Sequence, residues 1–121
     1  MSMRKYSSSE IDNLKFGQAG SIFIDGTSAS SPPSGNVFVA ITFLAASTFD
    51  SSGGLVAEDA NQYPNTQAAA HDESDGSESA TQGSGGLQID VNNTFPSGVT
   101  IYGRWTEIDL KYGSCIAYIG K

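Results

Sequence analysis

The chain has 121 residues and a formal net charge of −7, from 13 acidic and 6 basic side chains. This length is typical of one domain that buries enough surface to fold without disulfides, which agrees with the single cysteine. The acidic balance repels nucleic-acid phosphates and anionic membranes, so we expect neither as a partner. No apolar run is long enough for a transmembrane helix, which takes about 18 residues or more.

The first segment, residues 1–16, is polar and carries three of the six basic side chains. We interpret it as an arm that precedes a domain of residues 17–121. No apolar core follows its bases, so we expect no signal peptide and no export. Exposed apolar side chains on such an arm favour packing on another copy or on a larger shell, although the arm could also fold back. The candidate interface residues of the arm are Arg4, Lys5, Tyr6, Ile11, Leu14 and Phe16.

Short apolar runs bounded by Gly, Pro and Ser predict strands at residues 21–25, 37–44, 55–57 and 87–91. The run at 37–44 is rich in Val, Ile and Phe. Its length and the breakers on both sides favour a buried strand over a helix.

Residues 58–86 are rich in Ala, Ser, Gly and acids and contain no Ile, Leu, Val, Phe or Trp. Such a segment buries too little apolar surface to offset its ordering entropy, so we interpret it as a long acidic loop. His71 lies beside Asp72, and Asp72, Asp75 and Glu78 partly resemble a calcium loop, but the ligand alternation of an EF-hand is missing. We expect a solvated loop and no metal, while an ion near those three acids stays an open alternative.

Residues 95–120 predict a meander of strands centred on Trp105. Their alternation puts Val99, Ile101 and Trp105 on the core side and Tyr102 and Arg104 on the other side. Tyr102 and Arg104 are therefore candidate interface residues, since Tyr and Arg are enriched in protein interfaces, although simple cross-strand packing is the alternative.

The end of this meander carries two further predictions. Ile108, Leu110 and Tyr112 alternate with charged residues, so we expect all three to face the core. The last strand, with Ile116 and Tyr118 between other apolar residues, looks buried on both faces. The fold class that follows is an all-β, single-domain antiparallel β-sandwich or jelly-roll-like barrel.

The sequence contains no zinc-ligand spacing, no phosphate-binding loop and no nucleophile elbow. We therefore expect no enzymatic activity and no cofactor.

Three stretches of the chain resemble small virion structural proteins of tailed bacteriophages, particularly of aquatic hosts. They read GSIFIDGT, NVFVAITFLAASTFD and FPSGVTIYGRWTEIDLKYGSCIAYIG, and the resemblance covers residues 20–57 and 87–120. The closest functional class is the capsid decoration, or cement, protein. No site residue is carried over, because this class has no catalytic set.

The resemblance implies a protein that is made in the host cytoplasm and resides in the virion. Its partners would be a major capsid or other virion protein and further copies of itself, for which we expect a trimer. Two other functions stay open: a tail, neck or fibre component of the virion, and a non-viral β-sandwich module that binds carbohydrate. An exposed pair of Tyr or Trp side chains would favour the carbohydrate module.

Overall fold

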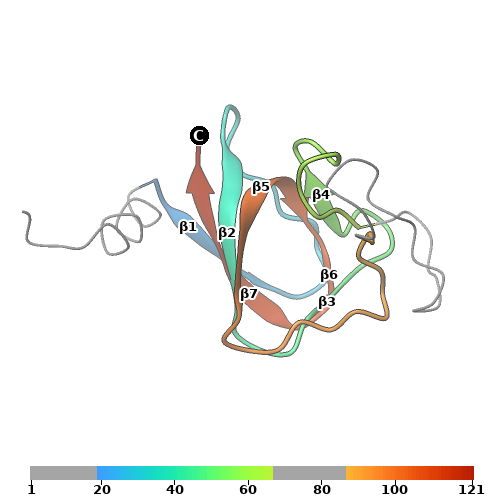
Figure 1. The fold of residues 1–121 in the computed structure, drawn as a ribbon. Helices are drawn as coiled ribbons and strands as arrows, with labels where there is room; N and C mark the ends of the chain where they lie inside the picture. Colours follow the sequence, from blue (N-terminus) through green and yellow to red (C-terminus); the bar gives the residue numbers. More distant parts are fainter. Residues whose placement is uncertain (1–18, 67–86) are drawn as a thin grey trace, which may run out of the picture.

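A computed structural model describes residues 19–66 and 87–121. Within these two ranges the chain forms seven strands and no helix, so the all-β prediction is confirmed (Figure 1). The strands are β1 (Ser21–Asp25), β2 (Val37–Phe43), β3 (Thr48–Phe49), β4 (Leu55–Ala57), β5 (Thr100–Ile108), β6 (Leu110–Tyr112) and β7 (Ser114–Gly120).

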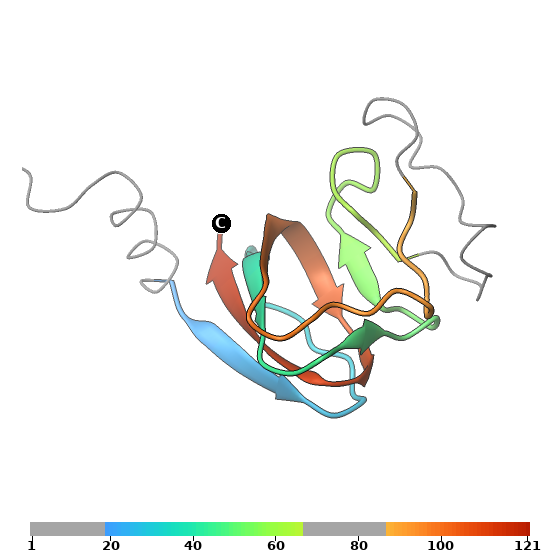
Figure 2. The same ribbon diagram turned by 60° about the horizontal axis from the view of Figure 1, so that its bottom comes forward.

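The strands form two antiparallel sheets, an arrangement consistent with the predicted β-sandwich. Five strands pair in the order β1-β7-β2-β5-β4, and β3 pairs with β6. The chain passes from β5 into β6 across Asp109 and returns to the larger sheet through Gly113. Figures 1 and 2 show that the strands curve around a common interior.

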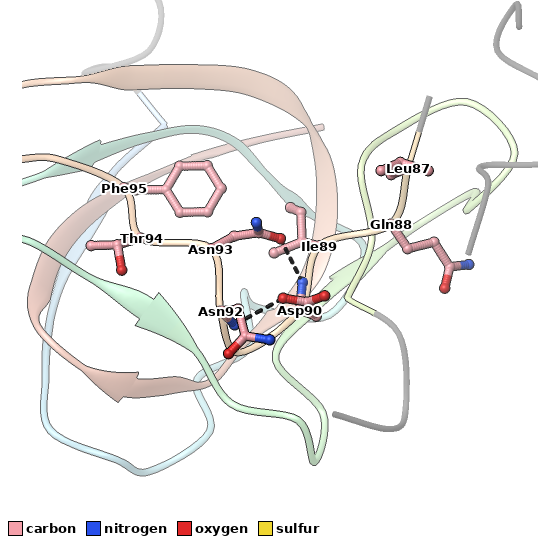
Figure 3. A pocket seen from close by; sticks show the side chains of 8 residues that line it. All are labelled: Leu87, Gln88, Ile89, Asp90, Asn92, Asn93, Thr94 and Phe95. Carbon is pink, nitrogen blue, oxygen red and sulfur yellow. Dashed lines mark hydrogen bonds between the residues drawn. The ribbon is translucent and has the colours of Figure 1, made fainter. Parts of the chain in front are cut away.

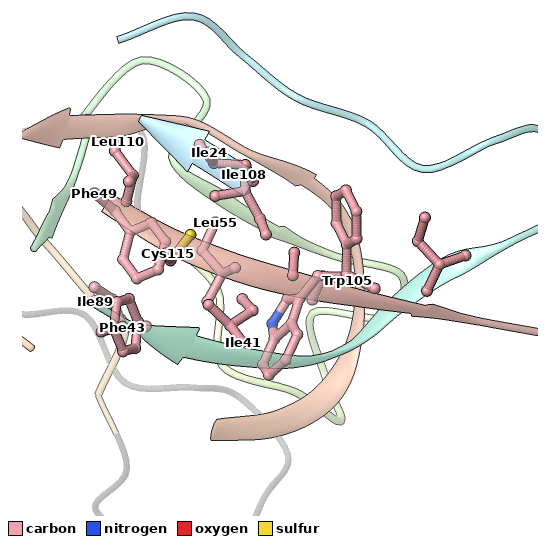
Figure 4. Packing of buried hydrophobic residues seen from close by; sticks show 14 residues of the cluster. Ile24, Ile41, Phe43, Phe49, Leu55, Ile89, Trp105, Ile108, Leu110 and Cys115 are labelled. Atoms are coloured by element: carbon pink, nitrogen blue, oxygen red, sulfur yellow. The ribbon is translucent and has the colours of Figure 1, made fainter. Parts of the chain in front are cut away.

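The interior is filled by side chains from both sheets (Figure 4). Trp105 is fully buried, and its ring lies against Gly103, where an added Cβ would stand only 2.8 Å from two ring carbons. The prediction that Trp105 occupies the core is confirmed. The fully buried large side chains around it include Phe38, Ile41, Phe43, Phe49, Leu55, Ile108 and Leu110.

Three phenylalanine rings join segments that are far apart in the sequence. Phe43 stacks on Phe95 with ring centroids 5.0 Å apart, and Phe49 meets both rings edge-on. Backbone hydrogen bonds between Ser47 and Phe95, of 2.8 and 2.9 Å, hold the same segments together. These contacts anchor the chain before and within the short strand β3, which sequence patterning did not predict because it has only two residues.

The turn between β6 and β7 depends on Gly113. Its φ is +106°, a conformation that L side chains rarely adopt, and a Cβ there would collide with Ser47.

Residues 58–66 are the described part of the acidic loop expected over 58–86; they form turns and no strand, and most of their side chains are exposed. Asp59 begins a turn in which its carbonyl accepts hydrogen bonds from the N–H groups of Gln62 and Tyr63. Tyr63 packs against the core cluster, and Thr66 is buried. Residues 58–66 are ordered by hydrogen bonds between polar groups and neighbouring backbone, and not by the burial of large apolar side chains. Residues 67–86, with His71, Asp72, Asp75 and Glu78, lie outside the described residues.

The strand predicted at 87–91 is wrong, because Ile89 makes only an isolated parallel bridge with Thr66. In this segment, side-chain oxygens accept hydrogen bonds from nearby backbone N–H groups. Asn93 Oδ1 accepts a 2.9 Å hydrogen bond from Asp90 N, and Asp90 Oδ1 accepts one of 2.8 Å from Asn92 N. Such local bonds compete with strand pairing.

Several side chains of the C-terminal meander are more exposed than predicted. Tyr112 is 48% exposed, and Val99, expected in the core, is 38% exposed just before β5. In β7 only alternate residues, among them Cys115 and Ala117, are fully buried, so this strand is buried on one face and not on both. The opposite face has no second layer among the described residues.

Candidate functional site

The outward face of the larger sheet collects apolar and aromatic side chains from four strands. The alternation of burial along β1 and β7 points Phe23, Ile116 and Tyr118 away from the core. Phe23 is 64% exposed and Leu44, which directly follows β2, is 47% exposed. We call this surface the outer face, and it comprises Phe23, Ala40, Thr42, Leu44, Thr100, Tyr102, Ile116 and Tyr118.

Strand register places these residues in rows across the sheet. One row runs through Phe23, Ile116, Thr42 and Thr100, in which the two threonine hydroxyls are hydrogen bonded at 2.8 Å. Because they bond each other, the threonines leave the centre of the face less polar than its composition suggests.

The next row holds a pair of tyrosines. Ala40 is the register partner of Tyr118 on one side and of Tyr102 on the other. Two strand spacings put the tyrosine Cα atoms roughly 10 Å apart. Tyr102 is 59% exposed, whereas Ala40 is buried without belonging to the core cluster. Ala40 therefore lies between the two tyrosines and is shielded from solvent.

Arg104 lies on β5, two residues after Tyr102, and donates hydrogen bonds to several acceptors. Its Nε donates to Glu58 Oε1 at 2.6 Å, a second guanidinium nitrogen donates to Glu58 Oε2 at 3.2 Å, and a third donates to the carbonyl of Lys121 at 2.8 Å. The hydrogen bond from Arg104 lowers the pKa of Glu58. The fork geometry fixes the orientation of Arg104 at the border of the outer face.

A polar hollow of about 400 Å³ lies along residues 87–95 (Figure 3). Asp90, Asn92 and Asn93 line it, and the side chains of Asp90 and Asn93 accept hydrogen bonds from backbone N–H groups of this same segment. These polar groups shape the loop, which accounts for their placement without a ligand.

Three carboxylates gather where β5 meets β6. Burial raises the pKa of Asp109, and the negative charges of Asp50 and Glu107 raise it further. Asp109 Oδ1 is buried and has no hydrogen-bond partner among the described residues. Within residues 19–66 and 87–121, no group of His, Cys, Asp and Glu side chains is arranged to hold a metal ion.

Cys115 is a packing residue in the strand β7. Its side chain is fully buried, and this burial raises the pKa of the thiol to about 12. A thiol with this pKa is almost entirely protonated at neutral pH and is a poor nucleophile.

Of the eight interface residues expected from the sequence, the described ranges contain two, Tyr102 and Arg104. Both lie on the outer face or at its border. Sequence patterning did not identify Phe23 and Tyr118 as residues of this outward surface, because each has apolar residues on both sides in the sequence. The other six lie outside the described residues, namely Arg4, Lys5, Tyr6, Ile11, Leu14 and Phe16.

The chain matches no protein-family model, and neither curated proteins nor solved structures show a significant similarity to it. No helix within residues 19–66 and 87–121 has the length and apolarity to cross a membrane.

Proposed function

We propose that this protein is a non-enzymatic structural component of a virion, in the class of capsid decoration proteins. In this role it binds a major capsid or other virion protein in many copies. The observation that carries the proposal is the outer face, an apolar and aromatic sheet surface with no second layer among the described residues. The resemblance of residues 20–57 and 87–120 to small phage virion proteins supports the same class.

The chemistry of the outer face suits a protein partner. Tyr102, Tyr118 and Phe23 offer large contact areas, and aromatic side chains dominate the energy of protein interfaces. Arg104 is already oriented by Glu58, so little side-chain freedom remains to be lost on binding. Modest affinity per copy suffices, because repeated sites on a symmetric shell add up.

The sequence of the arm supplies a second contact with the shell. Residues 1–16 combine three bases with Ile11, Leu14 and Phe16, a set that suits an acidic and apolar patch on a larger partner. We expect a chain without residues 1–16 to bind undecorated particles more weakly than the full chain does.

Binding to undecorated particles tests the proposal directly. Tyr102→Ala should weaken binding at least about tenfold, the usual effect of removing a central aromatic side chain. Tyr112→Ala is the matched control, since Tyr112 is also an exposed tyrosine but lies on β6 in the smaller sheet. Full binding by the Tyr102 variant contradicts the proposed role of the outer face.

The copy number in purified particles distinguishes positions within the virion. Quantitative mass spectrometry should find a number on the scale of the shell subunits. A number that matches a single tail or neck ring assigns the protein to that ring instead. Absence from purified particles refutes the virion proposal.

The tyrosine pair favours a second candidate function, a carbohydrate-binding module. Tyr102, which is exposed, and Tyr118, which is half-buried, flank Ala40 on the outer face, and sugar rings stack on aromatic side chains of this kind. Calorimetric titration with a panel of cell-wall and capsular oligosaccharides tests this candidate. Binding that Tyr118→Ala abolishes and Tyr112→Ala preserves would support it, and no heat with any oligosaccharide would exclude the panel's sugars as ligands.

A further inference from the structure

The two edges of the larger sheet differ in how their backbone groups are satisfied. At the β4 edge, Leu55 N donates to Thr66 Oγ1 at 2.8 Å, and Thr66 N donates back to the carbonyl of Leu55 at 2.8 Å. Ala57 N donates to Asn65 Oδ1 at 2.7 Å. The chain therefore covers this edge with its own residues, a common protection against strand pairing with other molecules.

The other edge, β1, is open among the described residues. β1 pairs with β7 alone, and Ile119 N donates to the carbonyl of Gly20 at 2.8 Å. Because hydrogen-bonded pairs alternate in an antiparallel ladder, the groups of Gly20, Ile22 and Ile24 point to β7. The N–H and C=O groups of the alternate residues point to the open edge; these are Ser21, Phe23 and Asp25.

Several common devices that prevent edge pairing are missing from this strand, although Asp25 places one charge at its end. β1 contains no proline, lysine or arginine, and its register against β7 runs without a bulge. All three residues whose backbone faces the open edge are exposed. The strand thus presents a short, regular ladder that is ready for a partner strand.

We propose that β1 pairs antiparallel with β1 of a second copy, in a register centred on Phe23. Phe23 then faces Phe23 of the other copy, and Ser21 faces Asp25. All three residues that point to the open edge form hydrogen-bonded pairs, for a total of about six backbone bonds. The two five-stranded sheets join into one, and the two outer faces become continuous.

Side-chain chemistry selects this register. The Ser21 hydroxyl can donate to the Asp25 carboxylate opposite, Ile22 lies opposite Ile24, and no two like charges face each other. If the register between the two strands shifts by two residues, either Ser21 or Asp25 no longer lies opposite a residue of β1 in the second copy. The pairing has two-fold symmetry, so it produces a dimer in place of the trimer expected from the sequence.

Disulfide trapping tests the register, and it needs no virion particle or sugar, so it is independent of the proposed function. Cα atoms in a hydrogen-bonded antiparallel pair lie about 5.5 Å apart, within the range that a disulfide spans. Phe23→Cys should therefore form a linked dimer under mild oxidation. The native Cys115 is fully buried and does not compete.

Matched cysteine variants make the test specific. Ser21→Cys alone and Asp25→Cys alone should stay unlinked, because each residue lies ~13 Å from its own copy in the partner. A mixture of these two variants should cross-link. Linking of Ser21→Cys alone, or no excess linking by Phe23→Cys over the exposed control Thr106→Cys, overturns the proposal.

Mass measurements by light scattering test association without cross-links. The wild-type chain should show a concentration-dependent shift towards twice the monomer mass. Phe23→Lys should shift it back to the monomer because it places two like charges at the two-fold axis. Ser21→Lys should preserve or tighten the dimer, since the lysine faces Asp25. Circular dichroism confirms that each variant folds.

Removal of residues 1–16 should leave the dimer intact. A wild-type monomer at all concentrations, a trimer, or loss of the dimer on this truncation would each overturn the proposal.

Discussion

Trp105 donates a 2.8 Å hydrogen bond from its indole Nε1 to the carbonyl oxygen of Pro64, 41 residues earlier in the chain. This bond ties the centre of the core to the segment that covers the β4 edge. A fully buried indole N–H would otherwise lack a partner, so the bond satisfies the one polar atom of the largest core side chain.

We expect Trp105→Ala to lower the free energy of unfolding by about 3–5 kcal/mol, because it leaves a large cavity and an unpaired carbonyl at Pro64. Trp105→Phe keeps most of the packing and should cost less. Chemical denaturation measures both variants. A loss below about 1 kcal/mol for the alanine variant would contradict the central position of this side chain.

Thr66→Val should destabilise the fold by about 1–3 kcal/mol, since it removes the acceptor for the buried N–H of Leu55 while conserving side-chain shape. Thr106→Val is the control, because Thr106 is exposed and its hydroxyl makes one long bond of 3.4 Å. Urea titrations of the two variants should differ clearly. Equal midpoints would show that the Thr66 bond contributes nothing measurable.

Replacement of residues 67–82 by a short Gly/Ser linker should leave the thermal midpoint nearly unchanged. The segment holds no large apolar side chain, and loop-closure entropy varies slowly with loop length. The replacement starts after Thr66, because Thr66 belongs to the packed part. Loss of cooperative unfolding would show that the fold depends on the replaced residues.

Asp109→Asn should raise the thermal midpoint at pH 7. Burial and two acidic neighbours raise the pKa of Asp109 above its unfolded value. The stability that its neutral form contributes is therefore complete below the unfolded pKa and is lost as pH rises through the folded pKa. Asparagine stays neutral, so the gain over wild type should vanish in acid. A gain that is equal at low and neutral pH would contradict this cause.

The Cys115 thiol should resist alkylation by iodoacetamide in the native protein at pH 8 and react readily in denaturant. Its burial both blocks access and raises its pKa to about 12. Mass spectrometry follows the added mass over time. Rapid native labelling would mean that β7 opens frequently.

Sequence patterning was sufficient for the local elements that carry a strong period. Alternation predicts that Trp105 faces the core, and the apolar run at residues 37–44 predicts a buried strand; the structure agrees with both predictions. Failures occurred where side chains bond to nearby backbone, as Asp90 and Asn93 do, because such bonds override the apolar pattern.

Long-range pairing was decided only by the tertiary structure. The order β1-β7-β2-β5-β4 brings Phe23, Tyr102 and Tyr118 onto one face, although they lie on three strands from opposite ends of the chain. Among the described residues, it also leaves β1 open at one edge of the larger sheet, while Thr66 covers the other edge. Periodicity determines which face of a strand a side chain occupies, but the neighbouring strand depends on packing free energy summed over the whole core.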